Sequence, residues 1–412
     1  MNTFSIIFLA ALALATAVRL WLALRHVRHV RAHRAHVPPE FTGEISLAAH
    51  QKAADYTCVK TRFAQMEIVA GTIIVLALTF GGGLQWLHDL ASGWLADGIF
   101  RGLLLLALTG LLVTLADLPL DLYRTFVIEQ RFGFNKMTVG LFFADLCKNL
   151  MVGALLVLPL AAGILWLIRE LGQYWWLWAW AVTVAYGVFA QFLAPTVIAP
   201  LFNKFSPLED AELRERIERM VTRCGFKVRE LMVMDGSRRS AHGNAYFTGF
   251  GASKRIVFFD TLLAQLRPPE VEAVLAHELG HFKLHHVVKR LAWSAVLSCG
   301  FFWLLSHFMS EDWFFNGLGV TSASSAMALV LFMFALPPFT FLLQPLGAMY
   351  SRKHEFEADQ YAARNASAQD LASALVKLYR DNAATLTPDP AHSAFYDSHP
   401  PALARIARLK ST

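Results

Sequence analysis

Two histidines and a glutamate stand at a spacing that can build a metal-dependent hydrolase: His277-Glu278-Leu-Gly-His281. Residues i and i+4 share one face of a helix, so both imidazoles can bind one zinc ion while Glu278 lies beside a water as general base. Pro268 and Pro269 just upstream favour a helix start, which is the context this motif requires. The spacing therefore predicts metal-assisted hydrolysis, against the plainer interpretation of two surface histidines.

A third protein ligand has to come from elsewhere in the chain. A catalytic zinc ion commonly has three protein ligands and one open position, and the residues after His281 lack the Gly and His of a metzincin motif. Glu355 is the first choice, with His354, Glu357 and Asp359 as rivals. Asp359, one turn after Glu355, could instead hold the second nitrogen of a ligand histidine. A solvated charged helix face is the simpler account of the same segment.

The composition indicates a membrane protein. Of the 412 residues, 56% are hydrophobic, which is too apolar for a water-facing fold. The net charge of +6 comes from basic residues in loops between apolar runs, which argues against a nucleic-acid partner. A bilayer core needs roughly 20 apolar residues per helix. The runs that meet this requirement are residues 4–24, 68–87, 102–118, 150–168, 174–193, 291–308 and 324–343.

The loop charges predict the orientation of these seven runs. Lys and Arg are frequent after the first run and between the third and fourth, whereas the alternate loops are short and carry acidic residues. The positive-inside rule then places the N-terminus outside and the C-terminus in the cytoplasm. The first run could instead be a cleaved signal peptide, although no Lys or Arg precedes it.

The rest of the chain predicts a cytoplasmic domain assembled from two segments. An amphipathic helix is expected over 208–223 and two short strands around 245–248 and 256–259, with a turn at 249–254. The division is then residues 1–193 for helices one to five, 194–290 for the metallopeptidase segment, 291–346 for helices six and seven, and 347–412 for the segment that completes the zinc site. The expected fold is a predominantly α-helical polytopic membrane protein with a gluzincin-type domain that contains a small β-sheet.

Several motifs together resemble one known family. These are His277-Glu-x-x-His281, Glu355-x-x-Ala-Asp359 and the upstream His242-Gly-Asn-Ala-Tyr-Phe247, with further similarity at 126–136, 254–263 and 398–401. They resemble the type I CAAX prenyl proteases, seven-span zinc endopeptidases that process isoprenylated proteins such as yeast a-factor and prelamin A. The resemblance covers nearly the whole chain and suggests a bacterial homologue.

The resemblance implies roles for further residues. Asn244 and Ala245 would lie on an edge strand that pairs with substrate backbone. His399 would donate a hydrogen bond to the oxyanion opposite the zinc, and Arg405 would brace the site. The same relatives enclose a chamber within their seven helices and bind one Zn²⁺ per chain.

Polar residues within or beside the apolar runs are candidates for lining such a chamber, because polar groups at that depth usually face protein or water. Snorkelling at helix ends explains several of them equally well. They are Asp117, Asp121, Asp145, Lys148 and Gln191.

Other functions remain open. A heat-shock-type membrane peptidase that removes damaged membrane proteins shares the metal motif, although such relatives have fewer spans. A seven-helix receptor or transporter would bind no zinc, and a zinc-bearing membrane chaperone would bind substrates without cleaving them. The favoured prediction is a multi-pass enzyme of the bacterial inner membrane, or of the endoplasmic reticulum in a eukaryote, acting on isoprenylated or damaged proteins with membrane lipid around it.

Overall fold

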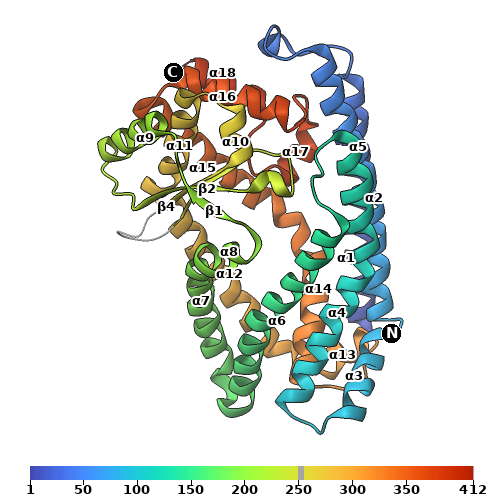
Figure 1. Cartoon of the computed structure of the whole chain (residues 1–412). Coiled ribbons are helices and arrows are strands. Elements are labelled where there is room, and N and C mark those ends of the chain that lie inside the picture. Colours follow the sequence, from blue (N-terminus) through green and yellow to red (C-terminus); the bar gives the residue numbers. More distant parts are fainter. Residues whose placement is uncertain (249–254, 412) are drawn as a thin grey trace.

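Seven long helical segments run side by side and carry a smaller mixed α/β part at one end (Figure 1). The computed structural model describes residues 1–248 and 255–411, and within these ranges seven segments are long and apolar enough to cross a membrane. This number agrees with the seven apolar runs. The segments are Thr3–Ala32, Leu47–Leu78, Ile99–Phe132, Val139–Glu170, Gly172–Phe202, His286–Phe308 and Ser325–Asn365.

The predicted bounds of the second span, 68–87, are wrong. The helix α2 runs from Leu47 to Leu78 and breaks at Thr79–Gly82, after which α3 (Gly83–Trp94) begins separately. Gly82 has φ +77°, a left-handed conformation that glycine adopts at little cost. Hydropathy detects only the lipid-facing half of α2, whereas the polar half from Leu47 continues the same helical hydrogen bonding.

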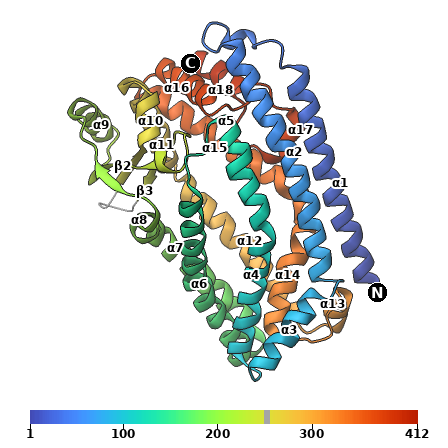
Figure 2. The same ribbon diagram turned by 45° about the vertical axis from the view of Figure 1, so that its right-hand side comes forward.

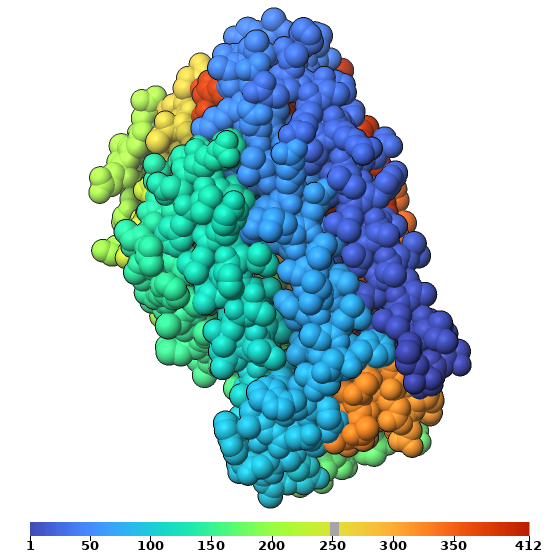
Figure 3. All heavy atoms as spheres, turned by 90° about the vertical axis from the view of Figure 1, so that its right-hand side faces the viewer, coloured from blue at the N-terminus to red at the C-terminus, as the bar shows by residue number. Residues whose placement is uncertain are grey.

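The polar extensions of α1 (Thr3–Ala32) and α2 reach the α/β part. Phe41 and Ile45, between these helices, pack against Val376, Leu386 and Ile406. Arg25 Nε also donates to the buried Asp389 carboxylate at 2.9 Å. These contacts explain why both helices exceed the length that a bilayer alone needs. Figure 3 shows α1 and α2 along one face, with the N-terminal residues beside the segment around α13 (Asp312–Gly317).

The last span continues without interruption into the α/β part. α14 (Ser325–Thr340) passes through a short 3₁₀ turn, η6 (Phe341–Leu343), into α15 (Gln344–Asn365), which carries Glu355 and Asp359. A single helical column therefore links the apolar bundle to these two carboxylates (Figure 2).

The sheet has four strands in the order β1-β2-β4-β3. The expected pair is confirmed as β3 (Ala245–Thr248) antiparallel to β4 (Arg255–Phe259), whereas the expected turn at 249–254 lies outside the described residues. The structure adds β2 (Glu230–Met234), parallel to β4, and β1 (Phe205–Pro207), antiparallel to β2. β3 thus lies at one end of the strand order.

Helices pack around this sheet. The expected amphipathic helix is α9 (Ala211–Arg223), which is capped by the Asp210 carboxylate and buries Leu213, Ile217 and Met220 in the same core as Ile256 and Phe258 of β4. The other bounds are α4 (Ile99–Tyr123), α5 (Gln130–Phe132), α6 (Val139–Glu170), α7 (Trp175–Leu193), α8 (Ala199–Phe202), α10 (Asp260–Gln265), α11 (Pro268–Lys283), α12 (His286–Phe308), α16 (Ala368–Asp381), α17 (Pro390–Tyr396) and α18 (Ala402–Lys410).

Three of the five candidate chamber residues have protein partners. Asp145 accepts hydrogen bonds from Arg239 at 2.8 and 3.1 Å, which ties α6 to the loop before β3. Lys148 Nζ donates to the Leu201 carbonyl at 2.9 Å, and Asp121 pairs with Arg124 at 3.2 Å. Asp117 is half-buried and Gln191 is exposed. The ion pair of Asp145 with Arg239 therefore has a structural role in this fold.

Glu270 in the first turn of α11 is expected to stabilise the α/β part strongly. This buried carboxylate accepts hydrogen bonds from Lys377 Nζ, Ser373 Oγ and the Arg267 amide, each at 2.7 Å. Burial opposes the charge, but the bonds from Lys377, Arg267 and Ser373 outweigh burial and lower the pKa of Glu270 from 4.5 to about 2. Its stabilising effect is thus present above pH 4.5 and is lost as the pH falls toward 2.

Replacing Glu270 by Gln should lower the free energy of unfolding by about 1.5–3 kcal/mol at pH 7, with a smaller deficit near pH 3. Thermal unfolding of the detergent-solubilised protein at both pH values measures this. Glu230→Gln, which breaks a surface pair with Arg255, is the matched control and should cost under about 1 kcal/mol. Equal losses in the two variants would contradict the assignment.

Candidate active site

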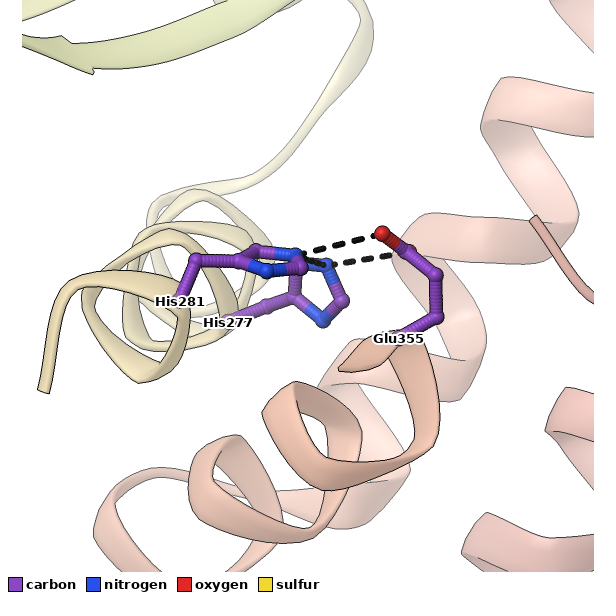
Figure 4. Close-up of side chains that lie close together, drawn as sticks. All are labelled: His277, His281 and Glu355. Carbon is purple, nitrogen blue, oxygen red and sulfur yellow. Dashed lines mark hydrogen bonds and ion pairs between the residues drawn. The ribbon is translucent and has the colours of Figure 1, made fainter. Parts of the chain in front are cut away.

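The helix α11 presents His277, Glu278 and His281 toward α15. Gly280 lies between the two helices, where an added Cβ would stand 3.1 Å from the Ala358 Cα and 3.1 Å from the Tyr361 Cβ. Any side chain at this position would push α15 away, so glycine lets the helices approach closely enough for the histidines to meet Glu355. Figure 4 shows both imidazoles of α11 pointing at the Glu355 carboxylate of α15.

The possible ligand atoms of three side chains converge between these helices. His277 Nε2 lies 3.1 Å from His281 Nε2 and 3.4 Å from Glu355 Oε2, and His281 Nε2 lies 3.2 Å from Glu355 Oε1. A tetrahedral zinc ion with ligand bonds of about 2.0–2.1 Å requires ligand atoms about 3.3 Å apart. The three side chains therefore fit a zinc ion. Of the candidate ligands in α15, Glu355 is the one that faces both histidines of α11.

Asp359 and Arg405 hold the first of these histidines. Asp359 Oδ1 accepts from His277 Nδ1 at 2.8 Å, which leaves the Nε2 lone pair free for a metal. Arg405, buried on α18, donates to both oxygens of Asp359 at 2.9 and 2.6 Å. Arg405 thus orients Asp359, and its Nη1 also lies 3.9 Å from Oε2 of Glu355.

His286 and Glu357 hold the second histidine, His281. This support was not predicted from the sequence. His281 Nδ1 lies 3.0 Å from His286 Nδ1, and His286 Nε2 lies 2.9 Å from Glu357 Oε2. If His281 Nδ1–H donates to His286 and His286 Nε2–H donates to Glu357, Nε2 of His281 faces the metal position unprotonated. The sequence signal was His286 itself, five residues beyond His281, together with the carboxylate two residues after Glu355.

The electrostatics of the site favour a cation. Burial disfavours the charged form of His277, but the carboxylates of Asp359 and Glu355 outweigh it and raise the pKa of His277 to about 9. The same two carboxylates that favour a proton on this imidazole favour a divalent metal ion in its place.

A cavity of about 510 Å³ opens beside these groups. Glu278, His281 and Glu355 line it together with His399, and no described hydrogen bond holds the half-buried Glu278 away from it. The His399 Nδ1 lies 2.6 Å from Glu355 Oε2. In this arrangement His399 can offer only Nε2 to a second partner, so its ring has to be protonated, or leave Glu355, before it donates a proton to an oxyanion.

The candidate substrate strand borders the same cavity. Tyr246 and Phe247 of β3 line it, and within the described residues β3 pairs with a strand on one side only. Asn244 is exposed at the start of β3, and its side chain accepts from the Ala245 amide at 2.8 Å, while its carbonyl accepts from the Phe259 amide at 3.0 Å. Asn244 and Ala245 thus lie at the start of an edge strand whose next two residues line this cavity.

Comparison with known proteins agrees with this architecture. Residues 26–204 match the family model described as CAAX prenyl protease N-terminal, five membrane helices, and residues 207–412 match Peptidase family M48. The CAAX prenyl protease 1 homolog of Arabidopsis thaliana is 34% identical over 381 residues, covering 90% of both chains. The human CAAX prenyl protease 1 homolog is 33% identical and covers 98% of this chain and 95% of its own. The crystal structure of S. mikatae Ste24p superposes with a TM-score of 0.92 at 30% identity, over 99% of both chains.

The chain belongs to the CAAX prenyl protease 1 family. It is therefore an integral, multi-pass membrane metallopeptidase, with seven helices around a chamber and a metallopeptidase domain at one end. This membership confirms the family, the fold class and the enzyme class that the sequence motifs predicted. It excludes the receptor, transporter and non-cleaving chaperone as the basic activity.

In this CAAX prenyl protease, Asp359→Asn should weaken metal binding about 10- to 100-fold. An amide can present its NH₂ group to His277 Nδ1 and so favour the wrong tautomer. Zinc affinity measured by competition with a chromophoric chelator checks this. Glu218→Gln on the exposed face of α9 is the control and should leave zinc affinity unchanged; an unchanged affinity for Asp359→Asn would contradict the role of Asp359.

Proposed function

We propose that the chain binds one Zn²⁺ through His277, His281 and Glu355 and hydrolyses peptide bonds near the C-terminus of isoprenylated CAAX substrates. The observation that supports this best is the convergence of the three ligand side chains, whose nearest ligand atoms lie 3.1–3.4 Å apart for each pair, at the wall of a cavity that Glu278 also lines. The separation of these atoms suits zinc, whose ligand bonds are short, better than a larger ion.

Glu278 has the chemistry and position of the general base. A bound zinc ion would supply Lewis-acid polarisation of the scissile carbonyl and of the attacking water. Glu278 follows His277 on α11, so its carboxylate reaches the water near the metal position without binding the metal. It takes a proton from that water and later delivers a proton to the leaving amine.

Substrate binding is proposed along the free edge of β3. An extended peptide can add to this edge through main-chain hydrogen bonds from Ala245, which tolerate many side-chain sequences, with the exposed Asn244 side chain beside it, because the Asn244 carbonyl is already bonded to the Phe259 amide. The scissile bond then lies between α11 and His399. His399, when protonated, donates to the developing oxyanion.

The loop charges support a cytoplasmic site. Basic residues concentrate in the loops on the side of the α/β part, as the positive-inside rule requires for a bacterial inner membrane. A substrate anchored by a lipid would then approach along the membrane surface.

Mass spectrometry of products tests this function. Purified protein is incubated with a farnesylated CAAX peptide, with the same peptide lacking the lipid, and with an unfolded membrane protein. The proposal predicts release of the terminal tripeptide from the farnesylated peptide and slower cleavage of the other two. Cleavage of the unfolded protein alone would overturn the substrate assignment in favour of a quality-control peptidase.

A further inference from the structure

A second group of metal-binding side chains lies beside the candidate active site. It consists of His286, His354 and Glu357, hereafter the outer cluster, whose ligand atoms all lie within 4.8 Å of one another. His286 begins α12, and the other two stand three residues apart on α15. The outer cluster shares no ligand with the group formed by His277, His281 and Glu355.

We propose that the outer cluster is a weaker, inhibitory Zn²⁺ site. Two neutral imidazoles and one carboxylate form a ligand set that binds zinc better than calcium or magnesium, because those two ions favour oxygen ligands. His286 Nε2 and Glu357 Oε2 are 2.9 Å apart, close to the spacing of neighbouring ligands on one zinc ion.

The outer cluster is accessible to an ion. His286 and His354 line the same 510 Å³ cavity as Glu278 and His399, and the Glu357 side chain is 34% exposed. An ion in this cavity is therefore beside the two histidines, although both rings are buried, and the partly exposed Glu357 carboxylate can turn toward it.

The outer site should bind zinc more weakly than the catalytic site for two reasons. The ammonium groups of Lys289 and Lys353 act on the outer cluster and oppose a cation, whereas Glu355 and Asp359 attract one at the catalytic site. The rings of His286 and His354 are also stacked, with centroids 4.0 Å apart and planes at 8°, so the His354 ring must turn before its lone pair can meet the ion held by His286 and Glu357.

Zinc in the outer site should disturb His281 by fixing the position of the proton on the His286 ring. When a metal takes Nε2 of a neutral His286, the single proton of that ring stands on Nδ1. Nδ1 then points at His281 Nδ1 from 3.0 Å, where His281 also carries its proton if its Nε2 binds the catalytic metal. Two N–H groups cannot bond each other, so the His281–His286 contact breaks and His281 loses its support.

This inference deepens the proposed function, because inhibition is measured through cleavage at the proposed catalytic site. His354→Phe is the informative variant, since it preserves an aromatic ring against His286 and removes one outer ligand without touching His281. His285→Asn, on an exposed histidine with φ 57° that asparagine tolerates, controls for zinc bound at the surface.

The experiment measures bound zinc and peptide cleavage while buffered free zinc is raised above the level that fills the first site. Wild type and His285→Asn should bind two zinc ions and lose activity as the second one binds. His354→Phe should have wild-type activity with one zinc ion, and its inhibition should require at least about tenfold more zinc.

Zinc stoichiometry distinguishes the possible failures. A single zinc ion in the wild type at every concentration, or equal inhibition of His354→Phe and wild type, would overturn the outer site. If the one-zinc protein failed to cleave any peptide, the proposed function would fall. The outer site would then still be supported by two bound ions in the wild type and one in His354→Phe.

Discussion

Glu278→Gln should lower kcat for peptide cleavage by about 100- to 10,000-fold while the protein retains one bound zinc ion. Glutamine preserves the size of the side chain and cannot accept a proton from water. The Glu278 side chain makes no described hydrogen bond and does not belong to the converging ligand set, so the three zinc ligands and the local fold should persist in this variant. Single-turnover cleavage of a farnesylated CAAX peptide, with zinc determined on the same sample, measures both effects.

The control for this prediction is Glu218→Gln, the same chemical change on exposed α9. It should cleave at the wild-type rate. Full activity in Glu278→Gln would exclude Glu278 as the base, and loss of zinc together with activity would show that Glu278 is a ligand instead.

Glu355→Gln should abolish stoichiometric zinc binding and reduce cleavage to background. The Glu355 carboxylate is the only anion that faces both His277 and His281 in the described cluster, at 3.4 and 3.2 Å. A neutral amide binds zinc far more weakly than a carboxylate does. Metal analysis after gel filtration and the cleavage assay report the two losses.

Glu357→Gln is the matched comparison, since the two glutamates stand two residues apart on α15. Glu357 contacts His286 and not the converging atoms, so this variant should retain one tightly bound zinc ion and lose at most about tenfold in activity. If Glu357→Gln lost zinc and Glu355→Gln did not, the ligand assignment would be reversed.

The sequence predicted the residues whose spacing is local and left out those that depend on tertiary contacts. His277 and His281 follow from the helical period alone, and Glu355 follows from the need for a third ligand near a helix of the same domain. The contacts of Asp145 with Arg239, and of His286 with Glu357, join positions 94 and 71 residues apart. No periodic pattern relates such positions.

Hydropathy identified seven spans but misplaced the second, for a physical reason. An apolar run reports which residues face lipid, whereas a helix ends where its hydrogen bonds end, as α2 does before Gly82. Similarly, β1 and β2 are short and their partners are distant in sequence, so alternation within each strand gave no signal strong enough to predict them.

Removing and restoring the metal tests the central claim most directly. The purified enzyme is stripped with a zinc chelator, and cleavage of a farnesylated CAAX peptide is followed as zinc is added back. Cleavage should vanish with the metal and return in proportion to zinc up to one ion per chain. Cleavage that persists in protein shown to contain no metal would contradict a zinc peptidase built on His277, His281 and Glu355.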